Sequence, residues 1–160
     1  MQSWWGQAMG PSARRWRRKM AGNLMLSEAA VSLLMARLAL ALISFQHLTR
    51  LFARRPRTPE LTGPERCWTR GNVQTALARA LIRLPFKTTC FHQAIAAQAM
   101  LRRRGVGATL CYGATTSPDR QLRTHVWLQD GMEGIVGQWV AERDGYHILA
   151  RYPEVPISQK

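Results

Sequence analysis

Residues 84–105 read LPFKTTCFHQAIAAQAMLRRRG, and this stretch decides the fold. Pro85 ends the apolar helical pattern that precedes it, and a new helix is predicted to begin at Thr88 to Cys90. Gly105 is a natural stop for that helix, and the three arginines before it complement the negative end of the helix dipole. The stretch therefore predicts a short helix that starts at a cysteine.

Beyond Gly105 the pattern changes from helical spacing to strands. Each apolar run is separated from the next by residues typical of turns, such as Ser117–Asp119 and Asp130–Gly131. This pattern predicts an antiparallel meander. The expected strands cover residues 107–116, 122–129, 134–141 and 146–152.

Upstream of the deciding stretch, the sequence predicts two more helices. The first is apolar on nearly all sides, with Ser27 as its N-cap and an end near Phe52. Residues 54–70 hold three prolines and a glycine and are predicted to form a loop. Asn72 is expected to cap the second helix. Helices first and a small antiparallel sheet last is an α+β arrangement.

The composition indicates one folded domain with a strongly basic character. The 160 residues are 46% hydrophobic and 20% charged, which suits a globular chain. Lys and Arg number 23 against nine Asp and Glu, and the net charge of +14 would attract a polyanion, an acidic peptide or a membrane surface. We expect a basic segment rich in Trp and Arg over residues 1–22, and a single domain over 23–160.

The location is predicted from what the N-terminal half lacks. The first 20 residues contain no continuous apolar region of the kind a secretory signal needs. The apolar segment 29–45 is interrupted by Arg37 and is shorter than the roughly 20 residues of a membrane span, so a buried helix is favoured. Three cysteines without small-loop spacing do not form a disulfide framework. A cytoplasmic protein with reduced thiols is expected.

Cys90 is the candidate nucleophile. Backbone N–H groups and the positive dipole end stabilise a thiolate at the start of a helix, and Lys87 adds to this effect. The alternative for a free cysteine is a small buried residue without chemistry.

His125 is the candidate base, 35 residues beyond Cys90 and in the middle of a predicted strand. A helix start packed on an antiparallel sheet can bring the two side chains together, and a cysteine nucleophile needs such a partner. His92 lies about 200° from Cys90 around the helix and is expected to point elsewhere.

A third group should orient the imidazole ring. A hairpin loop over residues 130–133 would place Gln138 across from His125, where its amide oxygen could accept the ring N–H. A tighter turn would place Val136 there instead.

Trp127 shares the strand face of His125. It is a candidate to shield the pair and contact substrate, and the alternative is a core aromatic. Cys90 and His92 lack the second ligand pair of a zinc site, and no phosphate-binding glycine loop is present, so neither a metal nor another cofactor is expected.

The blocks LPFKTTCFHQAIAAQAMLRRRGVGATLCYGA (84–114) and THVWLQDGMEGIVG (124–137) resemble the B2-type lasso peptide maturation proteins. These are leader peptidases with a transglutaminase-like, papain-related fold, and the resemblance covers roughly residues 23–150. It implies that Cys90 is the nucleophile and His125 the histidine. The third member of that family is usually an aspartate about a dozen residues beyond the histidine. Here that region reads IVGQW, without a carboxylate.

The resemblance implies hydrolysis of one peptide bond, between the leader and the core of a ribosomally made precursor peptide. The freed amine would pass to an ATP-dependent lasso cyclase that closes the macrolactam ring. Some relatives carry a leader-recognition domain with strands at the N-terminus, and residues 1–70 show no strand pattern. A separate leader-recognition protein (a RiPP recognition element) is therefore the expected partner.

Two alternatives use the same residues differently. The charge and the Trp–Arg segment fit a non-catalytic module that binds nucleic acid or a membrane surface. No recognised nucleic-acid motif is present, so nucleic acid is not an expected partner, and membrane association is not favoured. The second alternative is an acyl transferase that uses the Cys–His pair on another acceptor.

Overall fold

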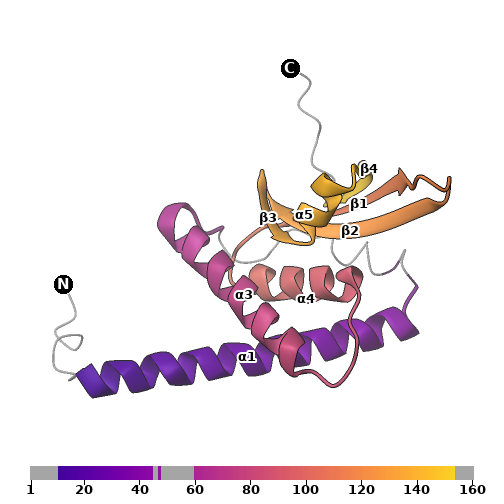
Figure 1. The fold of residues 1–160 in the computed structure, drawn as a ribbon. Helices are drawn as coiled ribbons and strands as arrows, with labels where there is room; N and C mark the ends of the chain where they lie inside the picture. Colours follow the sequence, from indigo (N-terminus) through magenta and orange to yellow (C-terminus); the bar gives the residue numbers. More distant parts are fainter. Residues whose placement is uncertain (1–10, 45–46, 48–59, 154–160) are drawn as a thin grey trace.

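The computed structural model describes residues 11–44, 47 and 60–153, with side chains from Met20 onward. The predicted α+β class is confirmed: helices come first, and a four-stranded antiparallel sheet follows (Figure 1). In chain order the elements are α1 (Pro11–Leu42), α3 (Gly63–Arg83), α4 (Cys90–Arg102), β1 (Thr109–Thr116), β2 (Leu122–Asp130), β3 (Glu133–Val136), α5 (Gln138–Arg143) and β4 (His147–Tyr152).

The sheet has the order β3-β2-β1-β4, and all neighbours are antiparallel. Helix α4 lies along one face of the sheet with α1 and α3 beyond it, and α5 lies on the other face (Figure 1). Gly113 on β1 pairs with His125 on β2. The pairing of β2 with β3 shifts by one residue between Leu128 and Gln129.

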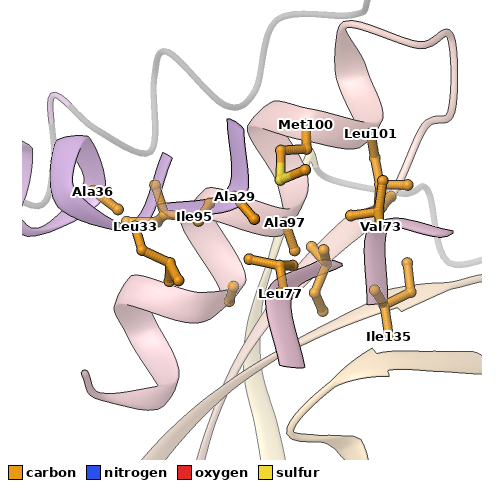
Figure 2. Close-up of a cluster of buried hydrophobic side chains, with 14 of the residues drawn as sticks. Ala29, Leu33, Ala36, Val73, Leu77, Ile95, Ala97, Met100, Leu101 and Ile135 are labelled. Carbon is orange, nitrogen blue, oxygen red and sulfur yellow. The ribbon is translucent and has the colours of Figure 1, made fainter. Parts of the chain in front are cut away.

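One hydrophobic core joins the three long helices to the sheet. Many of its side chains on α1, α3, α4, β1 and β2 are fully or almost fully buried (Figure 2). Four alanines on α4 let neighbouring backbones approach closely, because alanine fills little of the space between two helices. The most buried members of the cluster include Ala29, Leu33, Val73, Leu77, Ala97, Met100, Leu101 and Leu128.

The first helix is longer at its start than the sequence predicts. Ser27 is not its N-cap, because α1 runs unbroken from Pro11, and the predicted domain boundary after residue 22 falls inside it. The Ser27 hydroxyl donates to the Asn23 carbonyl one turn earlier, which satisfies it within the helix. The predicted end near Phe52 lies outside the described residues.

The second long helix also starts earlier than predicted. Helix α3 begins at Gly63 rather than after Asn72, so the second half of the expected loop is helical. Pro64 is tolerated in the first turn because its missing N–H is not needed there, and Glu65 complements the helix dipole. The helix ends before Pro85, as predicted.

The third predicted strand is shorter than expected and is followed by a helix. Strand β3 ends at Val136, and the rest of the predicted strand 134–141 forms most of α5. The physical reason is Gly137, whose φ of 73° is left-handed and breaks the extended conformation.

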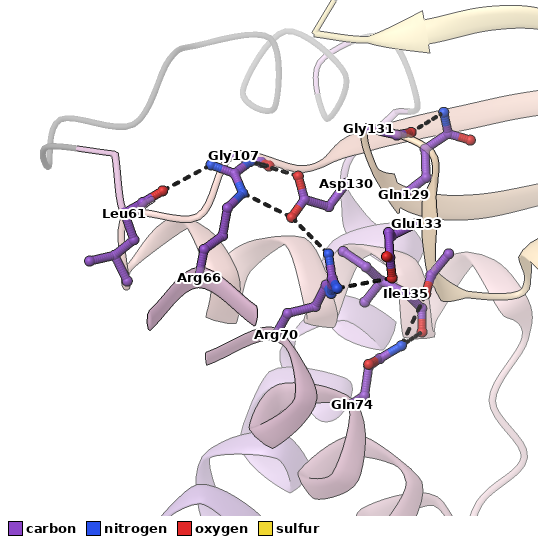
Figure 3. A network of polar contacts seen from close by, with 11 residues as sticks. Leu61, Arg66, Arg70, Gln74, Gly107, Gln129, Asp130, Gly131, Glu133 and Ile135 are labelled. Atoms are coloured by element: carbon purple, nitrogen blue, oxygen red, sulfur yellow. Dashed lines mark hydrogen bonds and ion pairs between the residues drawn. The ribbon is translucent and has the colours of Figure 1, made fainter. Parts of the chain in front are cut away.

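An ion-pair network fixes α3 against the β2–β3 hairpin (Figure 3). The Asp130 carboxylate accepts two hydrogen bonds from Arg66, at 2.6 and 2.9 Å, and one from Arg70 at 3.3 Å. The Asp130 side chain is 9% exposed. Arg66 also donates to the carbonyls of Leu61 and Gly107, so it ties four segments of the chain together.

The ionised form of Asp130 is the one that this network stabilises. Burial raises the pKa of Asp130, but the hydrogen bonds and charges of Arg66 and Arg70 outweigh burial, and the pKa lies below its ordinary value. A carboxylate with a depressed pKa adds stability above about pH 4, and that contribution is lost as the pH falls through the native-state pKa.

We predict that Asp130→Asn lowers the free energy of unfolding by about 2–3 kcal/mol at pH 7, because the Arg66 guanidinium loses its charged partner in a largely buried site. The matched control is Glu133→Gln, which removes an exposed partner of Arg70 and should cost under about 0.5 kcal/mol. Urea titrations at pH 7 and pH 3 measure both, and the Asp130→Asn deficit should shrink at pH 3. Equal effects of the two variants would contradict this role.

Candidate active site

Cys90 is the first residue of α4, as the sequence predicts. Thr89 is the N-cap, and it forms a capping box with His92. The Thr89 N–H donates to His92 Nδ1 at 3.0 Å, and the Thr89 hydroxyl lies 2.7 Å from the same nitrogen. His92 therefore holds the start of the helix through this capping box.

Arg37 on α1 influences both the protonation of His92 and the position of the loop before Cys90. Burial, together with the charge of Arg37, lowers the pKa of His92, and the neutral ring is the form whose Nδ1 can accept. Arg37 also donates to the Lys87 carbonyl at 3.0 Å and lies 5.3 Å from the centre of the Phe86 ring. Arg37 on α1 thus positions the loop that leads into the cysteine.

The thiol of Cys90 is free and half-buried, and it packs against the main core cluster. The first N–H groups of a helix have no intrahelical acceptor and point out of its N-terminus. A thiolate or an oxyanion at this position would meet the positive end of the dipole of a 13-residue helix.

His125 is held in one orientation on β2. It is 8% exposed, and its Nε2 lies 2.9 Å from the Gly137 carbonyl oxygen. A carbonyl only accepts, so Nε2 carries the hydrogen, and in the neutral ring the lone pair is on Nδ1. The ring is stacked on Trp127, with ring centroids 6.0 Å apart, and it is tilted against Tyr146, with ring centroids 5.3 Å apart.

Gly137 is the orienting group that the sequence interpretation missed. A Cβ on this residue would lie 3.0 Å from His125 Nε2 and 3.3 Å from the Val126 carbonyl oxygen, so a side chain there would be tightly packed as well as strained by the positive φ. The residue occupies the place, 12 positions beyond the histidine, where the resemblance implies an aspartate. In this chain the group within hydrogen-bond distance of the ring is the backbone carbonyl of Gly137.

Gln138 does not make the predicted contact with His125. The expected pairing of Gln129 with Gly134 is present, but the register shift in β2 and the left-handed Gly137 place Gln138 on α5. Its side-chain amide donates to Glu142 Oε1 at 2.7 Å instead. The group that contacts the His125 ring is the carbonyl of the preceding residue, Gly137.

Trp127 has the environment of a core aromatic. It is 3% exposed and packs with Cys111 and Ala141 in a second cluster. Its indole N–H donates to Gln129 Oε1 at 3.1 Å, and a Cβ on Gly113 would lie 2.8 Å from its ring. It supports the His125 ring from one side, and contact with a substrate stays a prediction.

Cys90 and His125 belong to different packed groups. Val126 and Leu128 on β2 belong to the core cluster that contains α4, whereas His125 and Trp127 alternate with them and belong with the residues around α5. Within the described residues no hydrogen bond joins the two side chains. The catalytic pair therefore stays a prediction, with each of its members separately positioned.

The other two cysteines have no such environment. Cys67 is exposed on α3, and Cys111 is fully buried on β1. Burial raises the pKa of the Cys111 thiol, which favours its unreactive form. In the part of the chain that the structure describes, no group of three His, Cys, Asp or Glu residues could hold a metal ion.

The sequence matches the model of the Transglutaminase-like superfamily over residues 30–151. This match covers most of the chain and includes α4 and all four strands, and the protein belongs to this superfamily. Its members are generally cysteine-dependent enzymes. No curated protein and no solved structure is significantly similar to the chain.

We predict that Gly137→Ala destabilises the fold more than Gly131→Ala does. Both glycines have left-handed φ angles, 73° and 60°, so each variant incurs roughly 1 kcal/mol of backbone strain. Only the Gly137 variant also meets His125, and this close contact should add about 1–3 kcal/mol. Urea unfolding measures the difference, which should shrink in a His125→Ala background. An equal cost for the two alanines would contradict the tight packing at Gly137.

Proposed function

We propose that this protein is a cysteine peptidase that removes the leader from a ribosomally made lasso precursor peptide. The observation that carries the proposal is a cysteine at the first position of α4, in a transglutaminase-like domain that also holds an oriented histidine with Nδ1 as its basic nitrogen. The finer task, leader removal, rests on the resemblance of residues 84–114 and 124–137 to the B2 proteins.

The place of His125 in the sheet sets the route by which Cys90 would have to reach it. The last residue of β2 that pairs with β3 is Leu128, so the stretch of β2 from His125 to Leu122 has β1 on one side and no strand of the described chain on the other. The proposal requires the start of α4 to reach the imidazole around this edge, because His125 packs on the face of the sheet away from α4 and beside Gly137. Pairing needs Nδ1 to face the sulfur, and Nδ1 is the nitrogen that Gly137 leaves available.

The proposed reaction has two steps. The Cys90 thiolate attacks the scissile carbonyl, N–H groups at the start of α4 hold the oxyanion, and the His125 imidazolium protonates the leaving amine of the core peptide. His125 then takes a proton from water, the resulting hydroxide attacks the thioester, and the leader leaves as a carboxylic acid while the thiol is restored.

The proposed partners follow from this task. A separate leader-recognition protein would present the leader, because the residues that the structure describes before Cys90 form helices and contain no strand for a recognition sheet. The freed amine would be the substrate of an ATP-dependent cyclase. The net charge of +14 favours an acidic leader or partner surface.

The test is cleavage of the precursor peptide encoded next to this protein's gene, in the presence of the recognition protein. Mass spectrometry measures the released leader and core. We expect Cys90→Ala to abolish cleavage and His125→Ala to lower the rate at least about a hundredfold. The matched controls are Cys67→Ala, which removes an exposed cysteine, and Gln138→Ala, and both should stay within about threefold of the wild type.

Cleavage that survives Cys90→Ala would overturn the proposal. A stable product in which the leader is joined to an added amine, without hydrolysis, would identify an acyl transferase instead. In that case Cys90 keeps its role and water is replaced by another acceptor.

A further inference from the structure

Helix α1 has a large apolar surface that the fold does not cover. Seven large apolar side chains along it are between 44% and 82% exposed. They are Met20, Leu24, Val31, Leu34, Met35, Leu38 and Leu42, and we refer to them as the α1 stripe.

The α1 stripe lies on one side of the helix. At 100° per residue its members fall within a sector roughly 100° wide, and the buried Ala29, Leu33 and Ala36 lie on the opposite side. The only charged residues between Met20 and Leu42 are Glu28 and Arg37, and both lie outside the sector. The helix is therefore apolar on two sides, and only one of them is used by the core.

The stripe continues into a groove beside α4. This hollow, of about 640 Å³, is lined mainly by apolar side chains such as Leu24, Val31 and Met35 from α1 and Ile95 and Ala99 from α4. An apolar surface this long is more than scattered exposed residues provide, and such surfaces mark sites of interaction.

The sequence of the same helix places a strong positive charge next to the stripe. Its first turns contain Arg14, Arg15, Arg17, Arg18 and Lys19, immediately before Met20. A cluster of basic residues beside an apolar helix face is the pattern of segments that bind anionic lipid surfaces, where the charges meet headgroups and the apolar side chains enter the acyl boundary.

We propose that α1 docks this protein on an anionic lipid bilayer, lying along the membrane surface with the α1 stripe in the interface. The segment Met20–Leu42 is long and apolar enough to cross a membrane. A spanning orientation would strip Ala29, Leu33 and Ala36 from the core that they form with α3 and α4, whereas surface docking keeps every one of these contacts. This proposal is independent of the peptidase function.

A second copy of the chain is the competing occupant, and charge disfavours a parallel pair. Two stripes packed in parallel would bring the two basic clusters together, with like charges within a few residues of each other. An anionic bilayer neutralises the same cluster.

The test is flotation of the full-length protein with two kinds of vesicle. One is pure phosphatidylcholine, and the other contains about 30% phosphatidylglycerol, which gives it a strongly negative surface. We expect binding to the anionic vesicles, weakened by raising the salt concentration. The stripe variant Leu24→Gln/Val31→Gln/Leu38→Gln should bind at least about tenfold more weakly, because it removes apolar area from the interface.

The matched control is Ile82→Gln/Met132→Gln/Leu149→Gln, which changes three exposed apolar residues outside α1 and should bind within about twofold of the wild type. A second variant, Arg14→Gln/Arg15→Gln, removes two charges from the basic cluster and should lower anionic binding about fivefold for each charge removed. Circular dichroism checks that each variant is folded.

Three results would overturn the proposal. One is failure of the wild type to float with anionic vesicles, and another is equal binding to both kinds of vesicle. The third is a dimer in sedimentation velocity that the stripe variant loses while lipid binding is unaffected, which would assign the stripe to a second copy.

Discussion

The packing of α4 is the constraint on which the rest of the structure depends. This alanine-rich helix is enclosed by α1, α3 and the sheet, and Ala94, Ala97, Met100 and Leu101 on it have no exposed surface. Because the core-facing side chains of its last two turns are buried, the helix cannot shift along its axis without opening cavities in the core. Its N-terminus, and with it Cys90, is therefore fixed relative to the strands.

Polar contacts hold the start of α4 in addition to this packing. Thr89 and His92 close the helix end, and Arg37 reaches across from α1 to hold the preceding loop. The oriented histidine is built by different means. The left-handed Gly137 turns the chain out of β3 so that its carbonyl faces the ring of His125. A carbonyl orients the ring and fixes its tautomer, but it stabilises an imidazolium less than a carboxylate does.

The strongest sequence signals predicted α4 and the change from helices to strands after it. Pro85 ends α3 because it lacks a backbone N–H, and Gly105 follows the end of α4 because it tolerates a helix stop, and both effects are local. The starts of α1 and α3 could not be predicted from Ser27 and Asn72, because a polar residue inside a helix can satisfy its side chain locally, as Ser27 does.

The candidate site was predictable only in part, for a similar reason. The position of Cys90 at a helix start follows from local pattern, whereas the partner of His125 depends on a one-residue register shift in the sheet. No side chain marks that partner, since it is a backbone carbonyl. The missing carboxylate in IVGQW was the available signal, and it pointed to Gly137 as much as to Gln138.

The central claim, that His125 activates Cys90, is tested most directly by the rate of alkylation of each cysteine by iodoacetamide at pH 7, read by mass spectrometry on tryptic peptides. Cys67 is an internal reference, because it is more exposed than Cys90 in the same chain. The account predicts that Cys90 reacts at least about tenfold faster than Cys67, and that His125→Ala brings the two rates together. A Cys90 rate that does not change in His125→Ala would contradict it.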